Sequence, residues 1–480
     1  MDLKETWRQH YACVPGHLED MHRVDGVASV FNANIDAVLK VQPEMLLQWM
    51  NELGADEWQV LNKGSRRISE PVDVLRGFVE CFSKGVAQEW LVQDEATFDW
   101  MREHLGYDRL QMGGQGGIIA NVMAVTGVKQ VYVHCISLPA QQAGLFLGRP
   151  SLVSTDSAGN LHPAGLIDRS GDRPLIHWIL EFDQGAELTL GGLSLVCPKS
   201  NRFIATYDPL NFQLAIDKPF AAALCAPHNP LNVILLSGYQ MLTEPLSDGE
   251  PGSGLARIHD SWSIVQAWKD AHPGAVVHFE FASTQDLKIR AALAREIAPK
   301  ADSVGCNEQE LIGILEVLGE TELVRECQSL SAIGLFKGLV RVYESLALKR
   351  VQLHMFGLYL TLIRPAARSQ GPSFQAQANR DGMVFAATLA ATKAGTGSLE
   401  YRENLLWAHG REVSDHSLKE LAALDAYVAK AYGLKGLAES GIVTAPQFDA
   451  VAVPTILIDR PVTLVGMGDT ISSLSLVGLR

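Results

Sequence analysis

Two glycines and an aspartate stand together in Gly466-Met467-Gly468-Asp469, ahead of the small residues 470–473. Glycines let the backbone turn tightly and approach a ligand closely. A helix beginning there would present free N–H groups and the positive end of its dipole, which together hold an anion such as a phosphate. Asp469 would then suit a base that accepts a proton from a hydroxyl attacking the phosphate. The plainer alternative is that Asp469 is only a helix N-cap.

A second polar motif, Asn32, Asn34 and Asp36, follows a buried apolar run. Residues spaced by two face the same side wherever the chain stays extended. Two amides and a carboxylate on one side would suit a polyhydroxylated ligand, because each can bind sugar hydroxyls. An ordinary turn built on Asn and Asp side chains is the alternative.

Residues 113–117 read GGQGG and precede the helical run 118–124. The glycines, Gly114 among them, permit close approach of the backbone to a ligand, and Gln115 can hydrogen-bond it. The segment is not a Walker A loop, because the Lys-Ser/Thr ending is absent, and it lacks the GxGxxG spacing of dinucleotide-binding folds. A glycine-rich turn without a ligand is the alternative.

Acidic residues occur in two further motifs. His278 and Glu280 are two residues apart on a predicted strand, so they share one face. Asn307 and Glu310 are three apart and would share a helix face. Two carboxylates and an amide suit Mg²⁺ held largely through waters. For the second motif, a capping box of Asn and Glu is the alternative.

Short apolar runs alternate with longer amphipathic ones, which predicts strand-helix units and a mostly parallel α/β sheet. The expected strands are residues 27–31, 130–134, 175–182, 232–236, 275–280, 453–458 and 462–465.

Two regions interrupt this alternation, residues 38–111 and 139–196. Ligands of parallel sheets bind beyond the carboxyl ends of the strands, where such insertions lie. We therefore expect a small lid domain from these two regions, and a large α/β nucleotide-binding domain from residues 1–37, 112–138 and 197–480. The alternative is that both regions decorate a single core.

The composition narrows the class of protein. The chain has 480 residues, 47% of them hydrophobic, and a net charge of −14, which argues against non-specific nucleic-acid binding. Seven cysteines without a CxxC pair indicate reduced thiols in a cytoplasmic protein. No apolar run is long enough for a membrane span, and the first residues lack the apolar core of a signal peptide.

In their joint order the motifs NxNxD, GGQGG, HxE, NxxE and GxGD resemble the ADP-dependent sugar kinase family of the ribokinase-like superfamily. The resemblance runs from about Val27 to the last residues, and residues 174–177, 201–204, 236–240 and 350–354 add to it. It implies a ribokinase-like three-layer sandwich with a mostly parallel central sheet, plus a sheet-based lid. It also implies transfer of the β-phosphoryl group of ADP to a sugar hydroxyl, release of AMP, and a need for Mg²⁺ or another divalent cation.

The resemblance also implies roles for individual residues. Asp469 would be the general base, and the amides of Gly466, Met467 and Gly468 would form an anion hole. Glu280 and Glu310, with Asn307, would support the metal. The sugar would contact Asn32, Asn34, Asp36, Gly114, Gln115 and His177. Arg202 would contact the nucleotide phosphates, and His354, Val453 and Thr455 are candidates around the nucleotide.

The choice of sugar rests on a few lid residues. Glu89 matches a glutamate with which glucose-preferring relatives bind a sugar hydroxyl. Arg173 and Lys199 are cations that could meet the phosphate of fructose 6-phosphate, or could simply be solvated. We expect a phosphofructokinase that also accepts glucose. A glucokinase, or a catalytically silent regulator that binds sugar or nucleotide, is the alternative. A monomer or weak homodimer and an archaeal source are further expectations.

Overall fold

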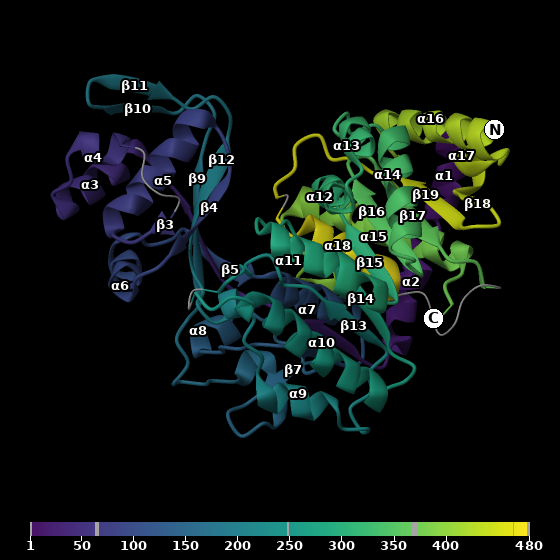
Figure 1. Ribbon diagram of the computed structural model, residues 1–480, viewed down its shortest axis with the longest axis horizontal. Coiled ribbons are helices and arrows are strands. Elements are labelled where there is room, and N and C mark those ends of the chain that lie inside the picture. Colours follow the sequence, from purple (N-terminus) through teal and green to yellow (C-terminus); the bar gives the residue numbers. More distant parts are fainter. Residues whose placement is uncertain (1, 63–66, 247–248, 367–372, 464, 478–480) are drawn as a thin grey trace.

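The computed structural model describes residues 2–62, 67–246, 249–366, 373–463 and 465–477, and it has two lobes (Figure 1). The large lobe is built on an eleven-stranded sheet and the smaller lobe on a six-stranded sheet. Each lobe has its own cluster of buried apolar side chains. Within the described ranges, no helix has the length and apolarity needed to cross a bilayer.

The centre of the large sheet is parallel. Seven strands in the spatial order β16-β15-β14-β13-β1-β6-β7 run in one direction. Their bounds are Arg350–Met355, Ser303–Cys306, Val276–Glu280, Val233–Leu236, Val27–Val30, Val131–Val133 and Leu152–Thr155. Antiparallel strands complete the two edges: β17 (Leu358–Ile363), β19 (Asp449–Pro454) and β18 (Ile442–Thr444) on one side, and β8 (Leu161–Pro163) on the other.

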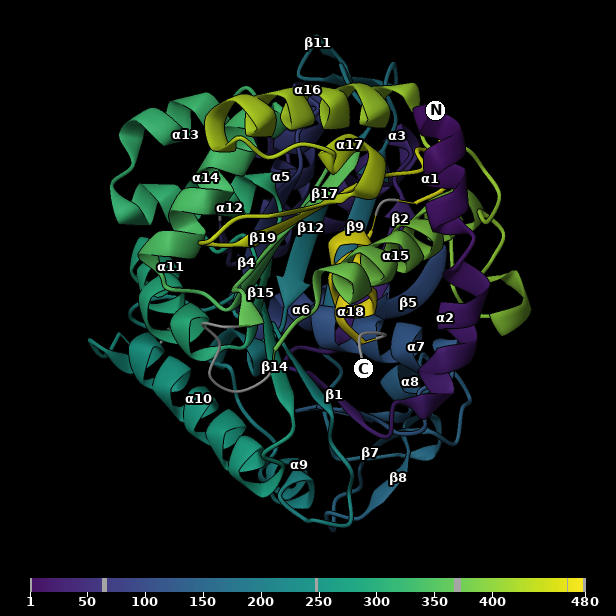
Figure 2. The same ribbon diagram turned by 90° about the vertical axis from the view of Figure 1, so that its right-hand side faces the viewer.

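Helices cover both faces of this sheet, as Figure 2 shows. One face carries α7 (Gln115–Thr126), α15 (Ala376–Thr396) and α18 (Met467–Val477). The other carries α10 (Ser253–Ala271), α11 (Leu287–Ala292), α12 (Glu308–Leu318) and α14 (Ala332–Ser345). Strands such as β1 and β13 are buried at every residue, as expected of a parallel sheet covered on both faces. The predicted three-layer α/β architecture with a second, smaller sheet is confirmed.

The small sheet has the order β3-β4-β12-β9-β2-β5. The strands span Arg67–Ile68, Gln88–Val92, Asn201–Tyr207, Ile176–Phe182, Asn34–Lys40 and Arg109–Gly113. Helices α3 (Pro43–Leu53), α5 (Pro71–Lys84) and α6 (Glu95–His104) pack against it. The hairpin of β10 (Glu187–Leu190) and β11 (Leu193–Val196) projects from the β9–β12 end (Figure 1).

At two points, strands belong to a different sheet from the one expected from the predicted domain boundaries. Strand β12, expected in the large domain, pairs antiparallel with β9 over its whole length. It belongs to the small sheet because the chain leaves β9, forms the β10–β11 hairpin and returns as β12, and strands joined in this way pair antiparallel. Strands β7 and β8, expected in the lid, extend the large sheet beyond β6.

Two predicted strands near residue 460 are also corrected. The strand expected over 453–458 is β19, which begins at Asp449 and ends at Pro454. The strand expected over 462–465 does not form in its described residues; Leu464 lies outside them. The Val462 N–H donates to the Ala394 carbonyl at 2.7 Å, so this segment crosses the end of α15 instead of joining the sheet. The last helix begins at Met467, three residues before the expected start.

Candidate active site

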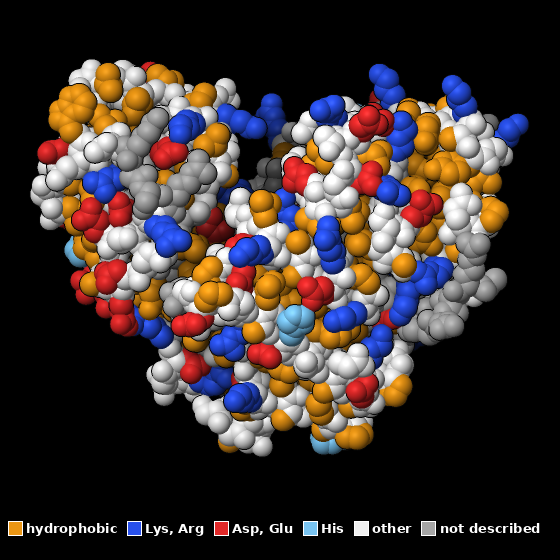
Figure 3. All heavy atoms as spheres, viewed as in Figure 1, with side chains coloured by type: hydrophobic (Ala, Val, Ile, Leu, Met, Phe, Trp, Pro, Cys, Tyr) orange, Lys and Arg blue, Asp and Glu red, His pale blue; other side chains and the backbone are white. Residues whose placement is uncertain are grey.

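A cavity of about 210 Å³ lies between the lobes, and the molecular surface is hollowed there (Figure 3). Both lobes contribute to its lining. The small lobe supplies β2, β4, β9 and β12, while the large lobe supplies the turns before α7 and α18. The predicted residues that line it are Asn32, Asn34, Asp36, Glu89, Gly114, Gln115, His177, Arg202, Gly466 and Asp469.

Asp469 is the third residue of α18, in the first turn, and it is half-buried. Gly466 has a φ of +63°, a left-handed conformation that L side chains rarely adopt. A Cβ at Gly468 would lie 2.9 Å from Nε2 of His354, so only glycine fits at this approach. The two glycines therefore let the start of α18 pack tightly beside the cavity, as their spacing predicts.

A hydrogen bond joins Asp469 to the GGQGG segment. Nε2 of Gln115 donates to Oδ1 of Asp469 at 3.0 Å, and Oε1 of Gln115 accepts from the Gly238 N–H at 3.0 Å. Burial raises the pKa of Asp469, while the bond from Gln115 and the charge of Lys393 oppose part of that rise. Gln115 therefore orients the carboxylate as well as lining the cavity.

The NxNxD motif keeps only part of its predicted alternation. Asn34 and Asp36 lie on one face of β2, where Nδ2 of Asn34 donates to Oδ1 of Asp36 at 3.0 Å. Asn32 precedes the strand with a φ of +64°, so it does not continue the extended pattern. Within the described part of the chain, neither side-chain polar atom of buried Asn32 has a hydrogen-bond partner. Unpaired buried amides are costly, and here they face a cavity suited to a polar ligand.

His177 is held by a carboxylate that the motifs do not include. Its Nε2 lies 3.1 Å from Oδ2 of Asp208, a fully buried residue that also accepts from Nδ2 of Asn211 at 2.8 Å. Nδ1 of His177 is 4.0 Å from Oε1 of Glu89. Burial opposes charging of the ring, but the bond and charge of Asp208, with Glu89 and Asp36, outweigh burial and raise the pKa of His177. Asp208 therefore stabilises the imidazolium form of the ring.

Beside the start of α18, side chains of Glu280, Glu310 and His354 place one ligand atom each within 4.8 Å of one another. Burial, and then the charge of Glu310, raises the pKa of Glu280 well above its usual range. Burial raises the pKa of Glu310 to about 8 and lowers that of His354 to about 4. Crowded, poorly solvated carboxyls of this kind are stabilised in their charged form by a cation.

Comparison with known proteins settles the family. Residues 25–478 match the conserved region of ADP-specific phosphofructokinase/glucokinase. The chain belongs to this family. It is 29% identical to an ADP-specific phosphofructokinase of Methanosarcina acetivorans, over 100% of this chain and 98% of the relative. It is 30% identical to an ADP-dependent glucose/glucosamine kinase of Pyrococcus abyssi, over 99% of this chain and 98% of the relative.

Solved structures of similar proteins agree with this family assignment. A last common ancestor of ADP-dependent phosphofructokinases from Methanosarcinales superposes with a TM-score of 0.86 at 27% identity, over 100% of this chain and 98% of that one. An ADP-dependent kinase in complex with fructose-6-phosphate and ADPβS superposes with a TM-score of 0.79 at 25% identity, over 99% of this chain and 97% of that one. The match is global, so both lobes of this chain have the architecture of the kinase family.

Several predicted site residues lie away from the inter-lobe cavity. Arg173 pairs with Glu95 and with Oδ1 of Asp99 at 2.9 Å, and Lys199 is exposed. Neither lines the cavity, because local partners and solvent hold their charges elsewhere. Oδ1 of Asn307 accepts from the Glu310 N–H at 3.0 Å, which forms the capping box considered above.

Three of the four nucleotide candidates lie together at one end of the large sheet, whereas Arg202 lies on β12 of the small sheet and lines the inter-lobe cavity. His354 is near the end of β16, while Val453 and Thr455 are at the end of β19. Val453 pairs with Tyr359, and the Thr455 N–H donates to the Gly357 carbonyl at 3.0 Å. These contacts place all three beside the turn that joins β16 to β17.

A buried polar network behind the acidic cluster was not predicted. His278 approaches Oε2 of Glu280 at 3.2 Å and Oγ of Ser472 at 2.6 Å, and Ser472 also donates to Glu280. Fully buried Arg350 donates to Oγ of Ser303 at 2.6 Å, and Ser303 contacts the other ring nitrogen of His278. The network ties α18 to the central strands. In the sequence, this network was indicated by the HxE pattern alone, because the residues that contact one another in it are far apart in the chain.

Proposed function

We propose that this protein transfers the β-phosphoryl group of ADP to a hydroxyl of a hexose or hexose phosphate and releases AMP. The observation that carries this is the position of Asp469: its carboxylate lies in the first turn of α18 and on the wall of the cavity that holds the unpaired Asn32 amide. A base, an anion-binding helix start and a polar pocket thus converge on one point, as attack of a hydroxyl on a phosphoryl group requires.

In the mechanism, Asp469 accepts the proton of the sugar hydroxyl. The hydroxyl oxygen forms a bond to the β-phosphorus as the bond between that phosphorus and the bridging oxygen breaks, and AMP leaves with the bridging oxygen. The N–H groups of Met467, Gly468 and Asp469 precede the first intrahelical bonds of α18, so they are available to the negative oxygens of the phosphoryl group. Gln115 keeps the carboxylate aimed at the cavity.

Glu280 and Glu310 would hold Mg²⁺, because their oxygens suit this hard cation and its charge would offset their repulsion. When bound, the ion supplies positive charge near the phosphate oxygens. His354 offers a nitrogen to the same place, and His278 and Ser472 orient the Glu280 carboxylate from behind.

The small lobe acts as a lid over the sugar. Its six strands lie within residues 34–113 and 176–207. Asp36, Glu89, His177 and Arg202 all project from this sheet into the cavity. Closure would bring them onto the sugar and exclude the water that competes for the phosphoryl group.

Fructose 6-phosphate and glucose are both candidate acceptors, in keeping with the relatives named above. Glu89 specifically favours glucose, because a carboxylate on the cavity wall repels a sugar phosphate but accepts a bond from a hydroxyl. Its Oε1 is held by Oγ1 of Thr206 at 2.6 Å. Arg202, which the family resemblance assigns to the nucleotide phosphates, lines the same wall as His177, so we assign both residues to the phosphate of fructose 6-phosphate instead.

The test is a set of incubations with Mg²⁺, each combining glucose or fructose 6-phosphate with ADP or ATP. Chromatography would measure AMP, ADP and sugar phosphate. We expect AMP and one equivalent of sugar phosphate from ADP with at least one sugar. No AMP from ADP with either sugar would overturn the proposal and favour a silent binding protein. The ratio of kcat/KM for the two sugars would assign the acceptor.

A further inference from the structure

Lys393 reaches the start of α18 from the last turns of α15. Its Nζ donates to the Gly466 carbonyl at 3.2 Å and to Oγ1 of Thr470 at 3.3 Å. Oγ1 of Thr470 donates in turn to the same carbonyl at 2.8 Å. A Cβ at Gly466 would lie 2.9 Å from Nζ, so the ammonium is packed directly against the turn. None of the motifs above includes this lysine.

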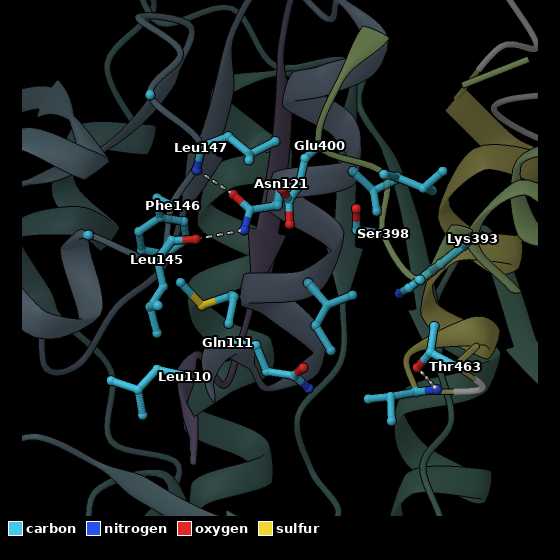
Figure 4. Close-up of a pocket in the computed structure, with 18 residues that line it drawn as sticks. Leu110, Gln111, Asn121, Leu145, Phe146, Leu147, Lys393, Ser398, Glu400 and Thr463 are labelled. Carbon is cyan, nitrogen blue, oxygen red and sulfur yellow. Dashed lines mark hydrogen bonds between the residues drawn. The ribbon is translucent and has the colours of Figure 1, made fainter. Parts of the chain in front are cut away.

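A second cavity, of about 440 Å³, opens onto Lys393 from the other side (Figure 4). Its lining mixes apolar side chains with polar ones such as Asn121, Ser398 and Glu400, and Figure 4 shows the lysine extending from its helix into the space that these residues enclose. Ile118 and Val465 line this cavity and the sugar cavity alike, so they separate the two. Lys393 is therefore within reach of a small solute that need not enter the sugar cavity.

The charges of the groups around Asp469 explain why a lysine near this carboxylate matters. On the α12 and β14 side, Glu310 and Glu280 repel its carboxylate, and Gln115 on α7 is neutral. His354 lies against Gly468, and burial lowers the pKa of its ring to about 4, so it is neutral at pH 7. The hydrogen bond from Gln115 and then the positive charge of Lys393 oppose the effect of burial on the pKa of Asp469.

We propose that Lys393 is a positioning residue for phosphoryl transfer, which holds the Gly466 carbonyl and the Thr470 hydroxyl in place and keeps the Asp469 carboxylate ionised. It acts through the turn and through Asp469, not by contact with the sugar. The inference rests on the proposed kinase function. Burial lowers the pKa of Lys393 to about 8, with the charge of Asp469 opposing the fall, so we expect activity to decline as the lysine loses its proton above that pH.

The first test compares Lys393→Met with wild type in the full-length protein. We expect kcat to fall about 100-fold, in the range of a lost charge contact in an active site, while the KM for the sugar changes less than about threefold. The acid limb of kcat/KM should move to higher pH, because the pKa of Asp469 rises when the cation is removed. Lys337→Met is the control, since Lys337 pairs with Glu326 on the opposite helical layer.

Two further variants distinguish charge from packing. Lys393→Arg should keep most of the turnover and, unlike wild type, should not lose activity above about pH 8, because a guanidinium stays charged. Lys393→Ala should recover at least tenfold in added ethylammonium but not in propanol, since the second cavity gives access to the vacated space. These two experiments decide the question if Lys393→Met does not fold.

Distinct outcomes would overturn distinct claims. An active wild type, with a folded Lys393→Met variant whose kcat and pH profile are unchanged, would refute only the role of Lys393. So would an unrescued Lys393→Ala, or an alkaline limb that persists in Lys393→Arg. Absence of AMP formation by the wild-type protein would refute the kinase function and this inference with it.

Discussion

Nε2 of Gln115 donates a 3.0 Å hydrogen bond to Oδ1 of Asp469, across 354 residues of chain. The bond connects the start of α7 with the start of α18, so two glycine-rich turns that are far apart in the chain form one wall of the cavity. The other end of the same amide is fixed by the Gly238 N–H. A single side chain thus sets the direction of the proposed base.

Replacement of Asp469 by Asn should nearly abolish turnover. The amide cannot accept the hydroxyl proton, and loss of a general base typically lowers the rate by about 10²–10⁴-fold. AMP formation would measure this, and calorimetry with ADP should give an affinity within about threefold of wild type. Turnover comparable to wild type would disprove the role of Asp469.

Asp208→Asn should weaken sugar binding more than it slows the chemical step. The fully buried carboxylate is the main group that raises the pKa of His177, so its loss lowers the pKa of the ring. His177 is charged below its pKa. The pH at which the KM for the sugar begins to rise should therefore move downward, with KM about tenfold higher at pH 7 and kcat within about threefold. Steady-state kinetics from pH 5.5 to 8.5 would check this, and an unchanged KM profile would argue against it.

Glu89→Gln should separate the two candidate sugars. Glutamine keeps one neutral acceptor oxygen but replaces the other with an NH₂ donor and removes the charge, so the bond from a glucose hydroxyl weakens and the repulsion of a sugar phosphate is lost. We expect KM for glucose to rise about fivefold or more, and KM for fructose 6-phosphate to stay constant or fall. Glu187→Gln, on an exposed position of β10, is the matched control. Parallel changes for both sugars would contradict the assignment of Glu89.

Mg²⁺ should stabilise the protein more at high pH than at low pH. Folding raises the pKa of Glu280, and raises that of Glu310 from 4.5 to about 8, so the metal-free folded state loses stability as pH rises from 4.5 to about 8. The ion binds the charged form and offsets this loss.

Thermal unfolding would measure the effect with and without Mg²⁺. The increase in Tm should be larger at pH 8.5 than at pH 5.5, and Glu310→Gln should remove most of the increase while raising the metal-free Tm at pH 8.5. An increase in Tm that is independent of both pH and Glu310 would place the ion elsewhere.

Local patterns in the sequence were sufficient to predict most strands of the large sheet. Runs such as Val27–Val30 and Val233–Leu236 are apolar at nearly every residue, which is the pattern of a strand buried on both faces. Local pattern failed where tertiary contacts compete with it. Residues 462–465 are almost as apolar as a strand, yet Val462 bonds to the end of α15, because β19 already has partners on both edges.

The sequence by itself determined which residue types stand at the chain positions that become the site. Glycines at 466 and 468, the carboxylates of Asp469, Glu280 and Glu310, and the amides of Asn32 and Asn34 are all present in recognisable spacings. Only the tertiary structure decided their partners. Asp208 beneath His177, Lys393 against Gly466 and Ser472 against Glu280 join segments that no local spacing relates. The reason is physical: spacing reports which face of one element a side chain occupies, whereas these contacts depend on how separate elements pack.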